Sequence, residues 1–452
     1  MRHGCRGCDR RQRHGAARRR QRCDGIDARA LAPADRSAVG ALAGVDGTAA
    51  HAGLLHLAAH REAARHHPRP RASDDPAVLR VAFIDQTGAD AGGAEESLTL
   101  LLRHLPGDID PLVVLFQEGA YAARLRALGL RVTVMPVSGG IAGSTREHPR
   151  LSGALGVPGA ALRLAERLRR EHIDVVHTNT LKAHVVGACA ARLAGVPCVV
   201  HFRDILEGRS RLAMRLVAAS CSRERIAISR AVARAYALPH TEVVPNPLDL
   251  RAATTFPARA EARAQLGIPD ESPVFGMIGR INRWKGHDRF LRAAAAVVGE
   301  AAAHFVIIGA PLFRDADFVD ELHAMAAALD LTPHVTFVPW LADPRPAYAA
   351  LDVLCNCSTK EPFGRTSLEA AAAGVPTICF DDGGTAELIV DGESGLVVPA
   401  GDEAALTRAI LAFACDERRR RSAGEAARAL LPRYDACRHA RSVSTILRRA
   451  AA

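Results

Sequence analysis

Short hydrophobic runs alternate with longer stretches of helical periodicity from residue 78 onward. The runs are rich in Val, Ile, Leu and Phe and lie at 78–85, 111–116, 174–179 and 198–202. Each precedes an Ala- and Leu-rich stretch of helical spacing, at 92–105, 120–129, 183–195 and 209–222. Strands that are apolar throughout and separated by helices are typical of a parallel sheet covered on both faces. This half of the chain is predicted to form a doubly wound α/β domain.

A second series of the same kind follows the stretch 243–257, which holds three prolines and reads as a connection between domains. Its hydrophobic runs lie at 274–279, 304–309, 335–340, 352–357, 377–381 and 395–399. The pattern therefore predicts two Rossmann-like domains, 78–250 and 251–435, with the break near residue 250. Ligands of such sheets bind beyond the carboxyl ends of the strands, so two facing domains create a cleft between them.

The first 75 residues differ from the rest in composition. They hold 15 Arg and no Lys against 8 Asp or Glu, so +7 of the net charge of +10 lies there. Because such a segment buries too little apolar surface to offset its ordering entropy, residues 1–77 are predicted to be a disordered tail. The alternatives are that this segment is a tail that binds an anionic surface, or that it is an artefact of assigning a start codon too far upstream. The rest of the chain is nearly neutral, so no nucleic-acid partner is expected.

Several classes of protein are disfavoured. The tail holds one CxxC pair, Cys5 and Cys8, without the second pair that a zinc site needs. The other cysteines lie mostly in apolar stretches, as free thiols do in a reducing compartment. No run of 18 apolar residues and no signal-like apolar core is present. We therefore expect a cytoplasmic protein.

Two cations follow the first strand of the second series. Arg280 and Lys285 lie in one loop that ends at Gly286. Two cations at the carboxyl end of a strand can bind a diphosphate and stabilise the negative charge that develops on it when it acts as a leaving group. The chain has only three Lys, at 182, 285 and 360, against 56 Arg. A retained Lys marks a place where a compact ammonium is needed. Surface charges on a solvated loop are the alternative.

Two acids are separated by seven residues in "EPFGRTSLE", residues 361–369. A helix beginning near Arg365 or Thr366 would direct free N–H groups and its positive dipole end toward the cleft, which suits a phosphate. Glu361 can accept hydrogen bonds from sugar hydroxyls, and Glu369 from the paired hydroxyls of a ribose. The alternative is that neither acid binds a ligand. One would then lie at the helix N-terminus, where the helix dipole favours a negative charge, and the other would be exposed to solvent.

These segments resemble a known family. "GRINRWKG", "EPFGRTSLEAAAAGVPT", "DVVHTN" and "AISRAVARAY" followed by "VVPNPLDL" are similar to the family 4 retaining glycosyltransferases of GT-B fold. The resemblance covers about residues 78–440. It implies transfer of a sugar from a nucleotide-sugar such as a UDP- or GDP-sugar, with retention at the anomeric carbon. It also implies that a last helix, 436–452, crosses back to the N-terminal domain.

The resemblance also assigns roles to residues. Arg280 and Lys285 would hold the donor diphosphate, Glu361 would contact the sugar, and Glu369 would bind the ribose. The remaining donor-binding positions are the backbone at Phe363, Gly364, Arg365 and Thr366 and the glycine loop at Gly92 and Gly93. Small residues in that loop let the backbone approach the ligand. A dinucleotide site at this loop, with Glu118 as the ribose acid, is disfavoured because G-x-G-x-x-G is absent.

One position departs from the family's pattern. Arg203 stands where the family often has a His near the sugar, and His201 lies two residues earlier. Because alternate residues of a strand share a face, either side chain is a candidate for the cleft. A core histidine is the alternative for His201.

No metal and no cofactor beyond the nucleotide-sugar are expected, since no convincing D-x-D occurs and the two cations can neutralise the leaving group. The implied mechanism is front-face attack by the acceptor hydroxyl, with the departing phosphate taking its proton. The resemblance implies a glycan or lipid-linked acceptor, contacted by loops such as 138–150. We therefore expect peripheral contact with the inner face of the membrane. The alternatives are a nucleotide-sugar 2-epimerase of the same fold and a non-catalytic partner that binds sugar nucleotides.

Overall fold

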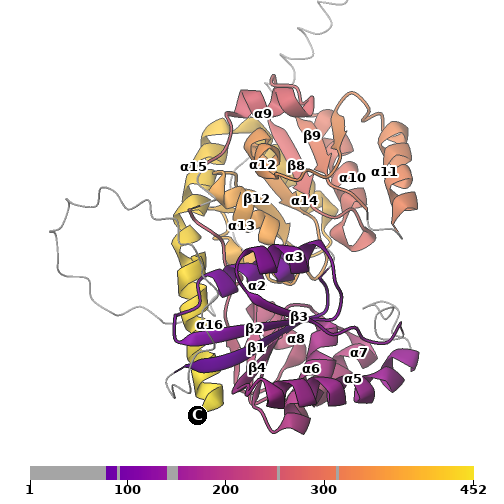
Figure 1. The fold of residues 1–452 in the computed structure, drawn as a ribbon. Coiled ribbons are helices and arrows are strands. Elements are labelled where there is room, and N and C mark those ends of the chain that lie inside the picture. The colour runs from indigo at the N-terminus through magenta and orange to yellow at the C-terminus, as the bar shows by residue number, and fades with distance from the viewer. Residues whose placement is uncertain (1–77, 89–91, 140–150, 252–254, 312–314) are drawn as a thin grey trace, which may run out of the picture.

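The computed structural model describes residues 78–88, 92–139, 151–251, 255–311 and 315–452. The chain forms two α/β lobes, stacked one above the other in Figure 1. The predicted disorder of residues 1–77 and most of the loop 138–150 lie outside the described residues, so both stay predictions.

The N-terminal lobe contains a seven-stranded parallel sheet in the order β3-β2-β1-β4-β5-β6-β7. Its strands are β1 (Leu79–Asp85), β2 (Ile109–Leu115), β3 (Arg131–Val134), β4 (Val175–Thr178), β5 (Cys198–Phe202), β6 (Glu224–Ala227) and β7 (Thr241–Val243). Its helices are α2 (Gly93–Arg103), α3 (Ala120–Ala127), α5 (Leu151–Arg170), α6 (Leu181–Ala194), α7 (Gly208–Cys221) and α8 (Arg230–Tyr236).

The C-terminal lobe repeats this plan with six parallel strands in the order β10-β9-β8-β11-β12-β13. Its strands are β8 (Val274–Ile278), β9 (His304–Ile308), β10 (Val335–Val338), β11 (Val353–Asn356), β12 (Thr377–Phe380) and β13 (Gly395–Val398). Its helices are α9 (Arg259–Leu266), η3 (Arg283–Lys285), α10 (His287–Val298), α11 (Ala316–Ala328), α12 (Arg345–Ala350), α13 (Arg365–Ala372), η4 (Thr385–Leu388), α14 (Glu403–Cys415), α15 (Glu417–Ala429) and η5 (Leu431–Tyr434).

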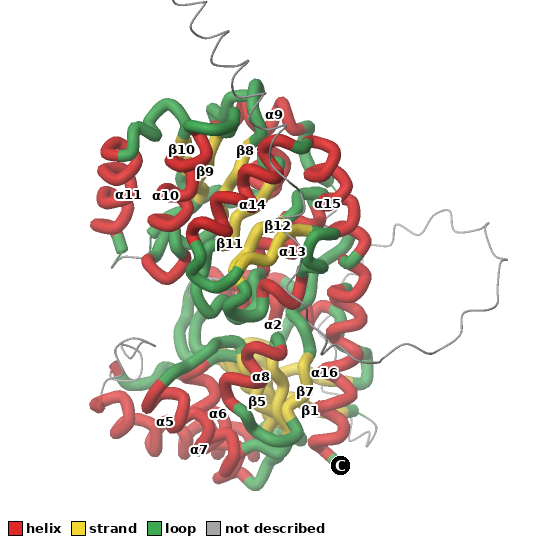
Figure 2. Tube along the Cα trace, turned by 180° about the vertical axis from the view of Figure 1, so that it is seen from behind, coloured by secondary structure: helices red, strands yellow, loops and turns green. Residues whose placement is uncertain are grey.

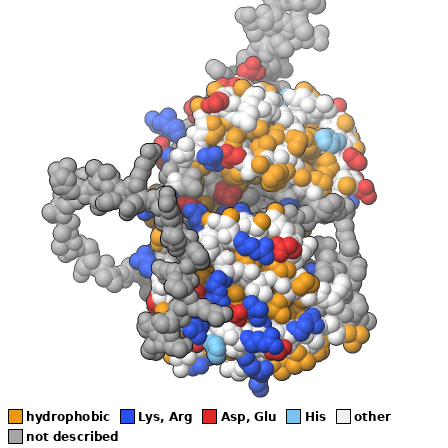
Figure 3. Space-filling view, in the orientation of Figure 1, with side chains coloured by type: hydrophobic (Ala, Val, Ile, Leu, Met, Phe, Trp, Pro, Cys, Tyr) orange, Lys and Arg blue, Asp and Glu red, His pale blue; other side chains and the backbone are white. Residues whose placement is uncertain are grey.

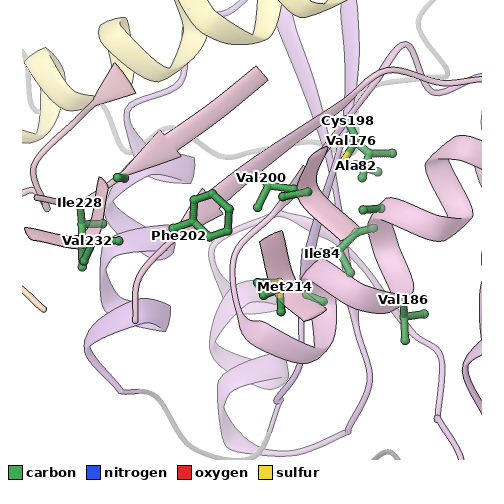
Figure 4. Packing of buried hydrophobic residues seen from close by; sticks show 14 of the residues in the cluster. Ala82, Ile84, Val176, Val186, Cys198, Val200, Phe202, Met214, Ile228 and Val232 are labelled. Carbon is green, nitrogen blue, oxygen red and sulfur yellow. The ribbon is translucent and has the colours of Figure 1, made fainter. Parts of the chain in front are cut away.

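Two apolar layers enclose the N-terminal sheet. On one face, β1, β4 and β5 pack against α5, α6, α7 and α8, and Figure 4 shows Ile84, Val200, Phe202 and Met214 meeting there. Strand residues alternate between the two faces, so Val81, Phe83 and Val199 belong to the other layer. Burial on both faces explains why the strands are continuous hydrophobic runs.

The last helix, α16 (Ala436–Ala451), packs on the second face of the N-terminal sheet although it follows the C-terminal lobe in sequence. Figure 2 shows α16 beside the strands of the N-terminal lobe. Ala440, Val443 and Leu447 are buried in one apolar cluster with Val175 of β4 and Val199 of β5. The chain thus crosses between the lobes twice, once after β7 and once before α16.

No helix among the described residues is both long and apolar enough to cross a bilayer. That finding concerns only the residues from 78 onward, with their internal gaps.

Candidate active site between the lobes

The loop after β8 places Lys285 next to Glu361. Gly286 has φ +77°, and a Cβ there would lie 2.2 Å from the carbonyl oxygen of Cys357, so only glycine allows this approach. The packing brings the Lys285 ammonium 2.5 Å from Glu361 Oε2. Both side chains are largely buried, at 20% and 11% exposure. The two sequence motifs therefore meet at one pair of opposite charges.

Arg280 spans the cleft. A Cβ at Gly92 would lie 2.6 Å from Arg280 Nη2, so the guanidinium rests against the glycine loop of the opposite lobe. Its guanidinium has no ion-pair or hydrogen-bond partner among the described residues. A cation in this position is available to an anionic ligand held between the lobes.

The predicted helix after Glu361 begins at Arg365 as α13, with Gly364 at its N-cap in a left-handed conformation. A Cβ at Gly364 would lie 2.3 Å from Thr385 Oγ1, so the turn needs glycine. Phe363 is buried against Tyr434, and only its backbone can face a ligand. Thr366 lies in the first turn and is partly exposed.

Glu369 is already paired in this structure. Arg365 Nε donates to Glu369 Oε1 at 2.8 Å, and Tyr348 Oη donates to Oε2 at 2.5 Å. Arg365 also reaches the other lobe, where its Cδ would lie 3.6 Å from a Cβ at Gly93 and its Nη1 donates to Ser97 Oγ at 3.4 Å. The i,i+4 spacing of Arg365 and Glu369 predicts their pairing. Tyr348 and Ser97 carry no comparable sequence signal.

His201 is not brought to the cleft. It has no exposed surface, and its Nδ1 lies 3.1 Å from His177 Nε2 while its ring stacks on His439 of α16. Burial, reinforced by the charge of Arg203, holds the pKa of His201 well below its usual range. His201 therefore lies in the core beneath the site. This is the core position that the sequence left open as the alternative to a place in the cleft.

Arg203 lies nearer the cleft but is also buried. Its Nε donates to Asn179 Oδ1 and its Nη1 to Asn246 Oδ1, both at 2.6 Å. Asn179 in turn donates to Asp85 and to the Ala94 carbonyl at the start of α2. Arg203 thus supports the glycine loop through Asn179 and does not itself point freely at a ligand.

Burial shapes the charges of this network. It lowers the pKa of the Arg203 guanidinium to about 10. Burial and the nearby Glu95 carboxylate raise the pKa of Asp85 to about 7, against hydrogen bonds from Asn179, Gln86 and Thr180 that favour its charged form. Of the buried polar groups at the carboxyl ends of β1, β4 and β5, only His201 and Arg203 were named as candidates from the sequence.

A cavity of about 470 Å³ lies between the lobes, next to the backbone of Glu361, which is bridged to the cavity-lining Gly383. The N-terminal lobe contributes Glu207, Arg211 and Arg234 to its lining, and the C-terminal lobe contributes Lys360 and the segment 381–383. Lys360 forms an ion pair with Glu207 across the lobes. The structure therefore has an open space beside Glu361 with polar groups on both walls.

Further bonds join the lobes below this cavity. Glu387 of η4 accepts hydrogen bonds from the backbone N–H groups of Arg230 and Ala231, at 2.9 and 2.7 Å. Ser229 Oγ donates to the carbonyl of Pro362 at 2.7 Å. A carboxylate from one lobe therefore caps helix α8 of the other.

No group of three or more His, Cys, Asp or Glu side chains placed to hold a metal ion occurs within the described ranges. The charged groups of the cleft include the cations Arg280, Lys285 and Arg365 and the carboxylates Glu361 and Glu369.

Two Rossmann-like lobes that face a charged cleft, joined by a returning last helix, define the GT-B class of glycosyltransferases. Two family models match the chain, "Glycosyltransferase Family 4" over residues 91–252 and "Glycosyl transferases group 1" over residues 258–430. The chain belongs to glycosyltransferase family 4, as its sequence motifs indicate.

Named relatives agree with this assignment. A D-inositol 3-phosphate glycosyltransferase of Salinispora arenicola is 30% identical over 390 residues, which cover 77% of this chain and 85% of that protein. A lipopolysaccharide core biosynthesis mannosyltransferase, LpcC of Rhizobium leguminosarum, is 34% identical over 180 residues, 40% of this chain and 51% of LpcC. In a D-inositol 3-phosphate glycosyltransferase of Nocardia farcinica, the match spans 38% of the relative's length.

The fold also matches solved structures. HepE of Anabaena in complex with UDP-glucose is 28% identical, with a TM-score of 0.71 over 82% of this chain and all of HepE. WaaG, a glycosyltransferase involved in lipopolysaccharide biosynthesis, shares the fold at 16% identity, with a TM-score of 0.59 over 81% of this chain and 99% of WaaG. The chain therefore has the fold of the GT-B glycosyltransferases.

Proposed function

We propose that this glycosyltransferase moves a sugar from a nucleotide-sugar donor to a hydroxyl of a glycan, lipid-linked or small-molecule acceptor, with retention of configuration at the anomeric carbon. The observation that carries the proposal is the meeting of Arg280, Lys285, Glu361 and Glu369 with the glycine loop in one cleft. The UDP and UDP-glucose complexes of HepE favour a uridine nucleotide over a guanosine one.

The charges of the cleft suit a donor of this kind. Lys285 and Arg280 would hold the diphosphate, and their attraction would increase as negative charge develops on the leaving phosphate. The free N–H groups at the start of α13 would add to this. Glu361 would turn from Lys285 to a sugar hydroxyl, and Glu369 would hold the ribose. Cations in these places can neutralise the leaving group without a metal ion.

The proposed mechanism also accounts for the proton of the acceptor hydroxyl and for the position of the acceptor. In front-face attack, the acceptor hydroxyl forms the new C–O bond on the side from which the phosphate departs, and its proton passes to that phosphate oxygen. No side-chain base is then needed. The cavity beside Glu361 would hold the acceptor, since its carboxylates can accept from hydroxyls and its arginines can donate to oxygens.

A donor screen tests the proposal. The protein is incubated with UDP- and GDP-sugars, and thermal stabilisation and slow hydrolysis of each donor are measured. One nucleotide-sugar should stabilise the fold and be hydrolysed, and Lys285→Ala should abolish the hydrolysis. Hydrolysis with no loss in Lys285→Ala would overturn the assignment of the site, and a new sugar nucleotide made from donor alone would identify an epimerase instead.

A further inference from the structure

Three cysteines meet on one face of the N-terminal lobe. Cys189 lies in α6, Cys198 is the first residue of β5, and Cys221 is the last residue of α7. The side chain of Cys198 belongs to the apolar layer between the sheet and helices α5 to α8, and Figure 4 shows it there beside Val176. Cys189 and Cys221 are partly buried and pack against the same layer. All three are free thiols in this structure.

The backbone brings the end of α7 to the start of β5. The N–H of Arg223, two residues after Cys221, donates to the carbonyl of Cys198 at 2.8 Å. Helix α6 packs beside α7. The side chains of Cys189 and Cys221 are close enough to form a hydrogen bond, and both interact with the thiol of Cys198. Two thiols from neighbouring helices therefore lie side by side, with a third beneath them.

The other free cysteines of the described residues differ from this group. Three are at most 2% exposed, on or beside strands β11 and β12: Cys355, Cys357 and Cys379. Burial shields these thiols from a dissolved oxidant. Cys437 is exposed but lies at the start of α16, which covers the other face of the N-terminal sheet. Cys189 and Cys221 combine partial exposure with a neighbouring thiol.

We propose that Cys189 and Cys221 form a reversible disulfide, which makes this pair a redox-sensitive modification site. The co-reactant is a small disulfide such as oxidised glutathione. One cysteine thiolate attacks a sulfur of that disulfide and releases one glutathione thiolate. The second cysteine then attacks the protein sulfur of the mixed disulfide and releases the other glutathione. Two protein thiols and one glutathione disulfide thus become one protein disulfide and two glutathione thiols.

The surface around the pair favours such an oxidant. Helices α6 and α7 contain five Lys or Arg and no Asp or Glu, and Figure 3 shows basic side chains on the N-terminal lobe. Oxidised glutathione is an anion at neutral pH, so a positive surface raises its local concentration.

A disulfide fits the three thiols better than a metal ion does. Thiolates bind soft metals, but the part of the chain that the structure describes holds no group of three or more His, Cys, Asp or Glu placed for one. In a reducing compartment, which the sequence predicts, disulfides are transient and respond to oxidising conditions. We therefore expect thiols at rest and the disulfide only on oxidation.

The disulfide would tether a weakly held helix. Only Met214 and Ala218 of the 14 residues of α7 are buried, whereas seven of the 14 residues of α6 are. The bond would fasten the last residue of α7 to the better-anchored α6, which Figures 1 and 2 show beside it. Gly208 and Arg211, in the first turn of α7, line the cavity between the lobes. Oxidation would therefore restrain one wall of that cavity.

Peptide mapping of the full chain tests the proposal, because trypsin separates the three thiols. It leaves Cys189 in peptide 183–192, Cys198 in 193–203 and Cys221 in 216–223. The folded protein is incubated with oxidised glutathione, alkylated and digested without reductant. A pH of about 8 suits the reaction, because partial burial and the neighbouring Cys221 raise the pKa of Cys189. Peptides 183–192 and 216–223 should appear as one linked species that dithiothreitol separates.

Variants and an unfolded sample sharpen the test. Cys189→Ser and Cys221→Ser should each abolish the linked species and leave the remaining thiol bound to glutathione. Cys437→Ser is the matched control and should form the link like the parent. The link should form at least about tenfold faster in folded protein than in urea, since the fold holds the two thiols together. Amide hydrogen exchange in α7 should slow by about tenfold or more once the link has formed.

Several results would overturn the proposal. Thiols that stay reduced, glutathione on both peptides without a link between them, or a link through Cys198 would each refute the pairing. Equal rates in folded protein and in urea would show that the fold does not prepare it. Unchanged hydrogen exchange in α7 would refute the tether. No sugar nucleotide is present in these experiments, so their outcomes are separate from those of the donor screen.

Discussion

The ammonium nitrogen of Lys285 lies 2.5 Å from a carboxylate oxygen of Glu361, although 76 residues separate them in the sequence. Each charge compensates the other in a site that is mostly shielded from water. A donor that bound here would offer Lys285 a diphosphate and Glu361 a sugar hydroxyl. The pair is therefore expected to separate on donor binding, with each partner taking a ligand group in exchange.

Lys285→Ala is expected to lower kcat by about 10² or more, the loss seen when one preorganised electrostatic contact to a transition state is removed. Lys285→Arg should recover only part of that rate, because a planar guanidinium cannot reproduce the point charge. Arg283→Ala, in the same turn but paired with Glu321 at the surface, is the control and should keep the parent rate. Steady-state kinetics with saturating donor measures each variant, and wild-type kcat in folded Lys285→Ala would contradict the diphosphate assignment.

Tyr348→Phe is expected to change donor affinity and leave kcat nearly unchanged. The hydroxyl of Tyr348 donates to Glu369, the proposed ribose acid, and so fixes the orientation of that carboxylate. Losing one such hydrogen bond should weaken donor binding by about 2- to 10-fold. Isothermal titration with the donor and with its free nucleotide gives the effect. An equal effect on a nucleotide that lacks the ribose 2′-hydroxyl would indicate that Tyr348 acts only through stability.

Glu387→Ala is expected to open the cleft. The carboxylate of Glu387 caps the first turn of α8 from the opposite lobe, so its removal leaves those N–H groups unsatisfied and loosens the contact between lobes. Small-angle scattering without ligand should give a larger radius of gyration than for the parent, and saturating donor should reduce it. Glu393→Ala, an exposed acid of the same lobe, is the control. Equal radii for Glu387→Ala and the parent would show that this cap does not hold the lobes.

Stability is expected to fall as the pH drops below about 6.5. His177, His184, His201 and His439 are buried, and burial together with Arg203 lowers all four pKa values, that of His184 and that of His439 to about 3. The unfolded chain therefore binds more protons than the folded one below its own pKa of about 6.5, so stability is complete above that pH and is lost as the pH falls. Asp85, whose pKa is raised, opposes this with a single group.

His439→Gln separates this effect from general acid sensitivity. The amide of Gln can donate to the Pro245 carbonyl, as His439 Nδ1 does, but it does not titrate. Denaturation in urea between pH 7 and 5 should show a shallower loss of stability, by up to about 1.4 kcal/mol per pH unit for one proton. Exposed His323 provides the control, and His323→Gln should leave the slope unchanged. A parent-like slope in His439→Gln would contradict the prediction.

The periodicity of the sequence predicts the main strands and helices because most of them are buried on one or both faces. The exceptions have physical causes. Helix α5 begins with a Gly- and Pro-rich stretch that resembles a loop and is helical nevertheless, with Pro158 inside it. Strand β6 reads Glu-Arg-Ile-Ala, which carries no alternation that would mark it as a strand. Tertiary packing decides both segments.

The candidate site is predictable where chemistry is concentrated in a motif and unpredictable where it depends on distant partners. Glu361 and Lys285 are visible in the sequence, but their direct contact depends on Gly286 passing close to Cys357. The sequence suggests that His201 and Arg203 share a strand face, but β5 ends at Phe202, and only the fold reveals that histidines of β4 and α16 enclose His201. No local pattern could have indicated this enclosure.

Helix α16 has a consequence for synthesis of the chain. It supplies Ala440, Val443 and Leu447 to the apolar layer on β1 and β4, which leave the ribosome more than 250 residues earlier. Helices α2 and α3 cover part of that layer early, but the part under α16 stays uncovered until α16 emerges, and a nascent N-terminal lobe exposes it to other chains and to chaperones. The lobe made first is thus completed by a helix made after the second lobe, and a chain whose synthesis stops within α16 would have an intact C-terminal lobe and an incomplete N-terminal lobe.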